Sequence, residues 1–294
     1  MEVASTVVKW YRIGFSIRGT SHIGAGLPLQ DSLRRWPKGN RPAALAAMTV
    51  LDGHGNKKHF RSALGATIGA DVATSTLSRW AKKLKDSTLT ENVAAVVSKK
   101  VAEEVHCSWV DRVSQHAACE PFELRSLSRL SDKEQKLLAV APQVAYGATY
   151  LSAIATERWG LLQRIGDGVI AVCDEEGNVT LPLGESEKSS QSTASLCFPN
   201  AVEQLQTHFI DFSLYSPTAC IVLATDGYPD AAGGVNRFKE RVVLFAETLK
   251  RLGPQEFAVW FRTHLDRVSE HLFDDSTIAF LVRSDWEPEG ESHA

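Results

Sequence analysis

The chain has 294 residues, a formal net charge of -3 and 44 % hydrophobic residues, which suits one large or two small domains with a buried core. The nearly balanced charge gives no electrostatic footprint for nucleic acid, and basic residues are not interleaved with aromatic ones as in a base-stacking groove. No apolar run is long enough to cross a bilayer, and the first residues do not resemble a signal peptide. We therefore expect a cytoplasmic protein without nucleic-acid or membrane partners.

The five cysteines are odd in number and widely spaced, and no CxxC pair occurs. This pattern excludes a disulfide framework and a zinc knuckle. It predicts buried free thiols in a reducing compartment.

The first half of the chain changes from strand-like to helix-like patterns. Residues 7–18 mix β-branched, aromatic and polar side chains and predict a strand, and residues 19–31 predict a glycine-containing loop. Residues 43–51 predict a buried strand that ends at Asp52. Between residues 57 and 138 apolar side chains recur at helical spacing, which predicts helices.

Strand-like patterns return after this helical region. The stretch "GATYLSAIATERWGLLQRIGDGVIAVCDEEGNVTLP" has short apolar runs broken by turn residues, which predicts an antiparallel meander. A polar loop at 184–197 precedes the strand-like "ACIVLATDGYPD". Residues 235–272 predict helix, interrupted near Gly253, and residues 276–284 predict a final strand.

This order of elements bounds the domain organisation. Strands, helices, strands, helices and a last strand favour one α+β domain whose sheets are covered by helices. We expect that domain to span residues 1–284, followed by a loose acidic tail at 285–294.

Acidic residues stand at the ends of four apolar strand-like runs; they are Asp52, Asp167, Asp226 and Asp274. Three of them are followed by glycine, which lets another group approach the backbone closely. A single acid at a strand end is most often a solvated cap or turn former. Four in one pattern predict a site for Mg²⁺ or Mn²⁺, which prefer oxygen ligands. A two-metal site of this kind serves phosphatases, nucleases and peptidases alike.

The segment "VLDGHGN" adds a histidine to this pattern. Asp-Gly after an apolar run is a common hairpin signal, so a turn is the simplest reading. A turn requires only one or two permissive residues, however, so turn formation does not explain an imidazole between two glycines. His54 is therefore either a loop histidine or a functional group beside Asp52.

Several of these segments together resemble a known family. "LDGHGN", "GATY", "RIGDG", "LATDGYPD" and "DDSTIAFLV" occur in the order and approximate spacing of the metal-dependent protein phosphatases of the 2C type. Upstream, "GTSHIGAGLPLQDS" resembles the opening motif of a bacterial branch. The segments run from Gly19 to Val282, so the resemblance covers almost the whole chain. It implies a β-sandwich of two antiparallel sheets with helix pairs on the outer faces and metals at one end.

The resemblance also implies ligands for two Mg²⁺ or Mn²⁺ ions. Asp52 would bridge the two ions, and the carbonyl of Gly53 would complete one coordination shell. Asp226 and Asp274 would hold the other ion. Asp31 would bind waters that are coordinated to the metals, without contacting the metals itself.

Two further roles follow from the same resemblance. Asp167 would support a third, weaker metal position together with Asp226. His54 would act as general acid, giving a proton to the departing seryl or threonyl oxygen while a metal-activated water attacks phosphorus. Imidazole suits this task because it titrates near neutral pH.

The chain departs from the family pattern around the first loop. Gln30 precedes Asp31 where many relatives have glutamate, so one ion loses a negative neighbour. Many relatives also have an arginine in this loop to bind the phosphate, and "GAGLPL" has none. Arg18 and His22 are the nearby candidates for substrate binding. We interpret Lys57 and Lys58 as solvated residues at a helix start.

The combined prediction is a Mg²⁺/Mn²⁺-dependent phosphoserine/phosphothreonine protein phosphatase. Its expected partners are phosphorylated proteins and a cognate Ser/Thr kinase. One alternative is a catalytically weakened phosphatase fold that binds or regulates phosphoproteins. Gln30 and the missing arginine favour it slightly, whereas the intact set Asp52, His54, Asp226 and Asp274 argues against it, since a scaffold needs none of these residues. Another is a metal-dependent hydrolase of a small phosphoester.

Overall fold

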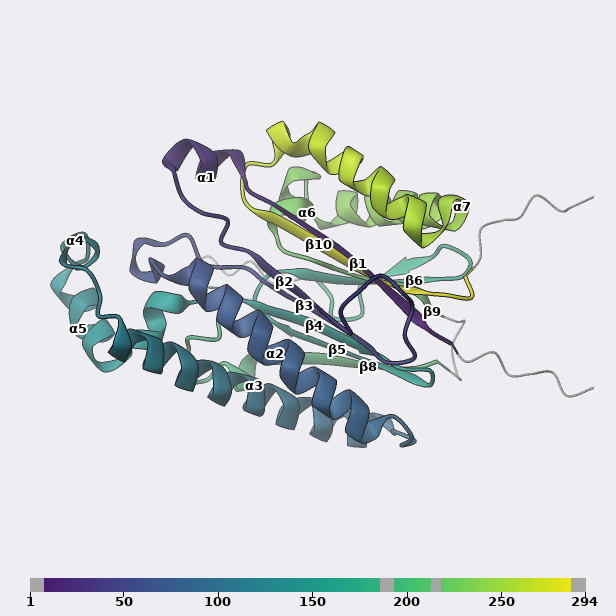
Figure 1. Cartoon of the computed structure of the whole chain (residues 1–294), viewed down its shortest axis with the longest axis horizontal. Helices are drawn as coiled ribbons and strands as arrows, with labels where there is room; N and C mark the ends of the chain where they lie inside the picture. The colour runs from purple at the N-terminus through teal and green to yellow at the C-terminus, as the bar shows by residue number, and fades with distance from the viewer. Residues whose placement is uncertain (1–7, 186–192, 213–217, 287–294) are drawn as a thin grey trace, which may run out of the picture.

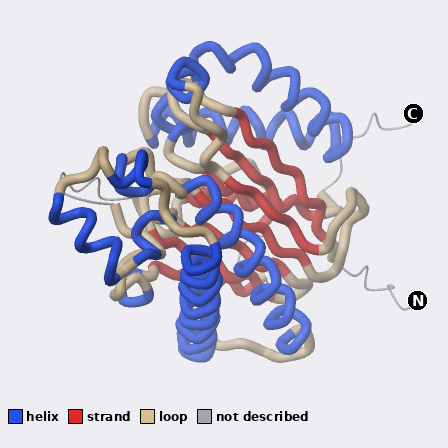
Figure 2. The backbone as a smooth tube through the Cα atoms, turned by 60° about the vertical axis from the view of Figure 1, so that its left-hand side comes forward, coloured by secondary structure: helices blue, strands red, loops and turns tan. Residues whose placement is uncertain are grey.

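The protein is a four-layered sandwich in which two antiparallel sheets lie between layers of helix (Figures 1 and 2). The computed structural model describes residues 8–185, 193–212 and 218–286. This architecture confirms the predicted α+β sandwich. Within those ranges, none of the helices combines the length and the apolar character needed to cross a membrane.

Each sheet has five strands in the described part of the chain. The first has the order β1 (Trp10–Ile17), β10 (Ser276–Arg283), β9 (Thr218–Ala224), β6 (Val169–Asp174) and β7 (Val179–Thr180). The second has the order β2 (Ser32–Trp36), β3 (Ala46–Leu51), β4 (Tyr150–Ala155), β5 (Trp159–Ile165) and β8 (Gln206–Asp211). Apolar side chains from both inner faces interdigitate between the sheets, so both sheets are held by one shared core.

Helix pairs cover both outer faces. α2 (Ser62–Leu84) and α3 (Glu91–Cys119) pack on the second sheet. α7 (Val235–Val268) packs on the first sheet and is bent at Gly253, whose φ of 73° no ordinary helical residue adopts. The predicted interruption at this glycine is confirmed, and it turns one long helix into two covering arms (Figure 1).

Shorter helices lie mostly at one end of the sandwich (Figure 1). They are α1 (Thr20–Ala25), η1 (Lys57–His59), α4 (Leu124–Leu127), α5 (Asp132–Val140), η2 (Pro142–Tyr146), η3 (Val202–Gln204), α6 (Gly227–Ala231) and η4 (Ser269–His271). Among them, α5 begins with a capping box in which Ser131 and Glu134 satisfy each other's backbone N–H groups.

The start of α2 packs without any side chain between it and η2. A Cβ atom on Gly65 would lie 1.8 Å from the carbonyl oxygen of Tyr146, so only glycine fits there. The indole of Trp109 on α3 donates to the Gly65 carbonyl at 2.9 Å. This close contact fixes the segment that leads from Tyr146 into β4.

The predicted antiparallel meander is wrong at its middle turn. β5 pairs with β4 and β8, whereas β6 pairs with β7 and β9, so the chain changes sheets between β5 and β6. Gly166 has a φ of 112°, and a Cβ on Gly168 would lie 2.8 Å from the carbonyl oxygen of Ala224. Both glycines are therefore needed for the crossing. Asp167, between them, lies where the two sheets meet.

Other expectations hold with smaller changes. The first and last predicted strands appear as β1 and β10, while β2 and β8 follow from no pattern that we identified. The predicted loop at 19–31 contains the short helix α1. Cys107 and Cys119 are exposed on α3, which corrects the expectation of buried thiols for those two. The other three cysteines are buried and free.

Two expectations fall partly outside the described residues. The polar loop at 184–197 includes residues 186–192, and the acidic tail at 285–294 includes residues 287–294. The boundary between domain and tail therefore stays a prediction.

Candidate metal centre

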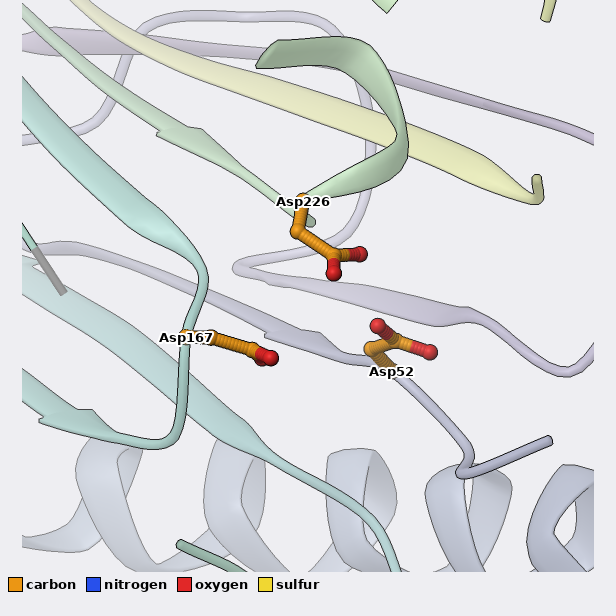
Figure 3. Close-up of side chains that lie close together, drawn as sticks. All are labelled: Asp52, Asp167 and Asp226. Atoms are coloured by element: carbon orange, nitrogen blue, oxygen red, sulfur yellow. The ribbon is translucent and has the colours of Figure 1, made fainter. Parts of the chain in front are cut away.

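Three carboxylates converge at one end of the sandwich. Asp52 follows β3, Asp226 follows β9, and Asp167 lies in the crossing between the sheets. Their side chains point toward one another, and one oxygen from each lies within 4.8 Å of the others (Figure 3). A set of oxygen donors alone suits Mg²⁺ or Mn²⁺. Asp167 was expected at a third, weaker position together with Asp226, and it lies near both Asp226 and Asp52.

Burial and, after it, mutual repulsion raise the pKa values of this group. Burial raises the pKa of Asp52 well above its usual range, and the charges of neighbouring aspartates raise it further. Burial, and then the charge of Asp167, raises the pKa of Asp226 to about 6. Without a cation, the folded protein therefore holds protons on carboxyl groups that are ionised in an unfolded chain.

Asp31 lies behind this group, at the start of β2. It is buried, and the Thr225 hydroxyl donates to its Oδ2 at 2.9 Å. Its Oδ1 has no hydrogen-bond partner among the described residues. Burial raises the pKa of Asp31 to about 7, although hydrogen bonds from Thr277 and Thr225 oppose the shift. A buried carboxylate oxygen without a donor is costly, and a cation or its waters would compensate it. The donor set therefore fits a hard divalent metal.

Asp274 lies at the edge of the centre. Its side chain is 59 % exposed, and its Oδ1 accepts a hydrogen bond from the Asp275 backbone at 2.8 Å. Its charge contributes to the raised pKa values of Asp52 and Asp226, so it is electrostatically part of the site. It does not belong to the group of three converging carboxylates.

The neighbouring Asp275 organises the first loop, a role that no sequence pattern predicted. Its buried carboxylate accepts hydrogen bonds from the backbone N–H groups of Gly19 and Gln30. His22 lies beside it, with Nδ1 2.8 Å from Asp275 and Nε2 3.4 Å from Asp274. His22 was predicted to bind substrate; its ring is buried against these two acids. The consecutive aspartates before a strand were the only signal for this arrangement.

Gly53 lies where no side chain fits. It forms an isolated bridge with Ala148, and a Cβ on it would lie 2.8 Å from the Gln30 carbonyl oxygen. Next to it, the Asp52 backbone accepts from Thr149 N at 2.8 Å and donates to Thr149 Oγ1 at 3.1 Å. Thr149 thus holds both the N–H and the C=O group of Asp52.

His54 is held in the loop that follows. Its backbone N–H donates to the Gly147 carbonyl at 3.1 Å, and its ring lies 5.0 Å from that of His59. A Cβ on Gly147 would lie 2.6 Å from His59 Nδ1 and 2.9 Å from His54 Cδ2, so both rings rest on bare backbone. Burial, and then the charge of Lys58, lowers the pKa of His54 to about 4. His54 is therefore neutral in the free protein.

Three basic residues differ in their relation to the centre. Lys58 is half-buried on η1, and its charge acts on both His54 and His59. Lys57 is exposed, with Nζ 3.7 Å from Glu134 on α5. Arg18 is exposed and donates to the Leu27 carbonyl at 3.2 Å. Lys58 is thus less solvated than we expected from the sequence.

The raised carboxyl pKa values predict a pH-dependent stability for the metal-free protein. These groups keep protons in the folded state above pH about 4, where an unfolded chain has lost them. The stability that these groups contribute is therefore greatest at low pH and is lost as pH rises through about 6 and 7, the folded pKa values of Asp226 and Asp31. Burial lowers the pKa values of His54 and His59 to about 4, so these histidines oppose the decline below pH about 6.5 and not above it. In EDTA, we therefore expect the melting temperature to fall by about 5 °C between pH 6.5 and pH 8.

Saturating Mn²⁺ should remove most of this decline in calorimetry or thermal fluorescence. Asp52→Asn should flatten the profile in EDTA, because it removes one repelling carboxylate. Asp86→Asn is the matched control, since its side chain is 88 % exposed at the far end of α2. A metal-free protein that is equally stable at both pH values would contradict the assignment.

Comparisons with known proteins agree with this geometry. Residues 18–268 match the family model described as protein phosphatase 2C. A comparison with curated proteins found no match. A bacterial serine phosphatase is 12 % identical in sequence at a TM-score of 0.58, with 92 % of this chain and 96 % of that one covered.

Two further solved structures have the same fold. Serine/threonine phosphatase Stp1 from Staphylococcus aureus is 12 % identical at a TM-score of 0.57, covering 96 % of this chain and 97 % of that one. The catalytic domain of the phosphatase PstP, in complex with two manganese ions, is 14 % identical at a TM-score of 0.52, covering 95 % and 100 %. The family match spans most of the chain, and the sandwich and its acidic end agree with it: the chain belongs to the protein phosphatase 2C family.

Proposed function

We propose that this protein is a Mg²⁺- or Mn²⁺-dependent phosphoserine/phosphothreonine protein phosphatase. The observation that carries the proposal is the convergence of Asp52, Asp167 and Asp226, backed by a buried oxygen of Asp31 that has no donor among the described residues. The manganese ions in the PstP structure support the same donor chemistry. When bound, such ions lower the pKa of water enough for it to attack phosphorus at neutral pH.

Each proposed ligand would have its own role in holding the ions. Asp52 would bridge two ions, with the Gly53 carbonyl beside it. Asp226 and the exposed Asp274 would hold the second ion. Asp167 would support a third, weaker position, and Asp31 would accept hydrogen bonds from the ions' waters.

His54 is proposed to protonate the leaving oxygen. In the free protein it is neutral, because burial and Lys58 disfavour the imidazolium. A phosphate dianion next to the ring favours the imidazolium, since an opposite charge raises the pKa of a base. Bound substrate would thereby raise the pKa of His54, so that the ring can carry the proton that it donates. His59 and Gly147 would hold the ring in place.

The phosphate requires positive charge from the protein as well. The sequence predicts Arg18 or His22 for this role. Lys58 is a third candidate, because it is half-buried and its charge acts on His54. Its charge also acts on Glu134, whose ion pair is with Lys57. The phosphorylated protein and a cognate kinase stay proposals of the same kind.

The first prediction tests the activity itself. With Mn²⁺, the protein should hydrolyse p-nitrophenyl phosphate and a phosphothreonine peptide, and EDTA should abolish both reactions. Asp52→Asn should lower kcat by about a hundredfold or more, because it removes a charge from between two cations. Asp86→Asn should keep wild-type rates.

The outcome also separates the alternatives. Turnover of p-nitrophenyl phosphate without any turnover of phosphopeptides would favour a small-phosphoester hydrolase. Binding of phosphopeptides without turnover of either substrate would favour a regulatory phosphoprotein-binding module.

The second prediction concerns His54. A threonyl alkoxide is a poor leaving group and requires a proton, whereas p-nitrophenolate is a stable anion. His54→Gln should therefore reduce kcat on the phosphothreonine peptide by about a hundredfold to ten-thousandfold, and clearly less on p-nitrophenyl phosphate. Both rates are measured at saturating Mn²⁺. Equal losses on the two substrates would assign His54 a purely structural role.

The third prediction identifies the phosphate-binding cation. Lys58→Met should raise KM for p-nitrophenyl phosphate and the inhibition constant of inorganic phosphate about tenfold, the scale of one charge-assisted hydrogen bond. Lys57→Met, which removes an exposed charge already paired with Glu134, should change neither constant. If Arg18→Met gives the larger change, the phosphate is bound at the first loop instead.

A further inference from the structure

An exposed apolar surface borders the metal centre. Ile23, Leu27 and Phe273 are 54 %, 39 % and 74 % exposed, and we call these three residues the rim patch. Single exposed apolar side chains are ordinary on protein surfaces. Three that gather beside a site are less so, because exposed apolar clusters mark interaction surfaces.

Backbone hydrogen bonds fix the parts of the rim patch relative to one another. Ser21 N donates to the Phe273 carbonyl at 3.0 Å, and Leu27 N donates to the His22 carbonyl at 2.8 Å. α1 thus lies against the segment that leads from η4 into β10 (Figure 1). The rim patch therefore has a fixed shape, because α1, the loop after it and the segment before β10 are hydrogen-bonded to one another.

The same segments hold the edge of the metal centre. Phe273 directly precedes Asp274, and His22 lies 3.4 Å from the Asp274 carboxylate. The first loop also reaches the segment after Asp52: Gln30 N donates to the Asp275 carboxylate, and a Cβ on Gly53 would lie 2.8 Å from the Gln30 carbonyl oxygen. A phosphoresidue bound at the proposed metal centre would therefore have its neighbours in sequence near the rim patch.

The loop that contributes Ile23 and Leu27 to this surface is uncharged. Residues 19–30 contain no lysine, arginine, aspartate or glutamate, although 23 % of the chain is charged. Residues 23–28, Ile-Gly-Ala-Gly-Leu-Pro, are all exposed. Charges flank this loop, because the exposed Arg18 donates to the Leu27 carbonyl and the exposed Asp274 follows Phe273. The exposed apolar side chains between them gain most when an apolar side chain covers them.

We propose that the rim patch binds the substrate polypeptide beside its phosphoresidue and selects a bulky apolar residue there. The proposal rests on the proposed phosphatase function and adds the substrate class. The selected residue lies close to the phosphoresidue in sequence, because Phe273 of the patch directly precedes the proposed ligand Asp274. The patch supplies contact to the peptide and takes no part in proton transfer.

The experiment compares two phosphothreonine peptides that differ only near the phosphothreonine. One carries leucines on both sides, and the other carries serines. Wild type should show a kcat/KM about five- to tenfold higher for the leucine peptide, a modest value for an apolar contact. The double substitution Ile23→Ser and Leu27→Ser should bring this ratio close to one. A ratio cancels any general change in the activity of the variant.

Val259→Ser is the matched control, because Val259 is a 70 % exposed apolar residue on α7. It should leave the ratio unchanged. A wild-type ratio near one, or a ratio that the double variant does not alter, would overturn the proposal. So would a patch-dependent change in oligomeric state by light scattering, since the patch would then cover a second copy of the chain.

A binding measurement separates this proposal from the phosphatase proposal. Fluorescence anisotropy is measured with both peptides carrying a non-hydrolysable phosphonate in place of the phosphate. Tighter binding of the leucine peptide that depends on Ile23 and Leu27 supports the rim patch even if no phosphopeptide is turned over. Equal binding of the two peptides, with normal turnover, rejects the rim patch and leaves the phosphatase activity intact.

Discussion

The close approach of partly buried carboxylates is the constraint on which this structure depends. Asp31, Asp52 and Asp226 are brought close enough for burial and neighbouring charge to raise their pKa values. Like charges repel one another, so the scaffold must hold these acids together in the absence of a cation. It does so with strand ends, with the double clamp of Thr149 on Asp52, and with glycines where a side chain would collide. The binding energy of a cation would offset what this arrangement costs.

Much of this could be predicted from the sequence. Buried strands read as apolar runs and helices as periodic ones, so β3, β9, β10 and the bend of α7 follow from local patterns. The acids at strand ends and the motif order indicated the metal centre. What these patterns could not give is pairing between distant segments: which sheet a strand joins depends on contacts across the whole chain. The meander prediction failed for that reason, because a turn at Gly166–Gly168 looks the same whether it closes a hairpin or changes sheets.

The site shows the same division between local and distant information. Asp52, Asp167 and Asp226 stood out because each follows an apolar run. Asp275 and His59 did not, because their roles come from partners far away in sequence: Asp275 accepts from Gly19 and Gln30, and His59 lies against Val144. Residues that position a site act through partners that are distant in sequence, so no local spacing pattern predicts them. His54 lies between these cases, since its glycines mark a special loop while its contact with Gly147 appears only in the fold.

The position of the acids at strand ends, outside the packed layers, has an evolutionary consequence. Asp52 and Asp226 contribute no apolar packing, and neutralising either relieves repulsion in the metal-free protein. If genetic drift substituted these aspartates, the chain would still fold and would gain thermal stability, while it would lose its ability to bind the metal. Catalysis in such a scaffold persists only under selection for turnover. Its inactive descendants would keep the sandwich, the first loop and the surfaces that meet other proteins, and could survive as silent copies with a binding role.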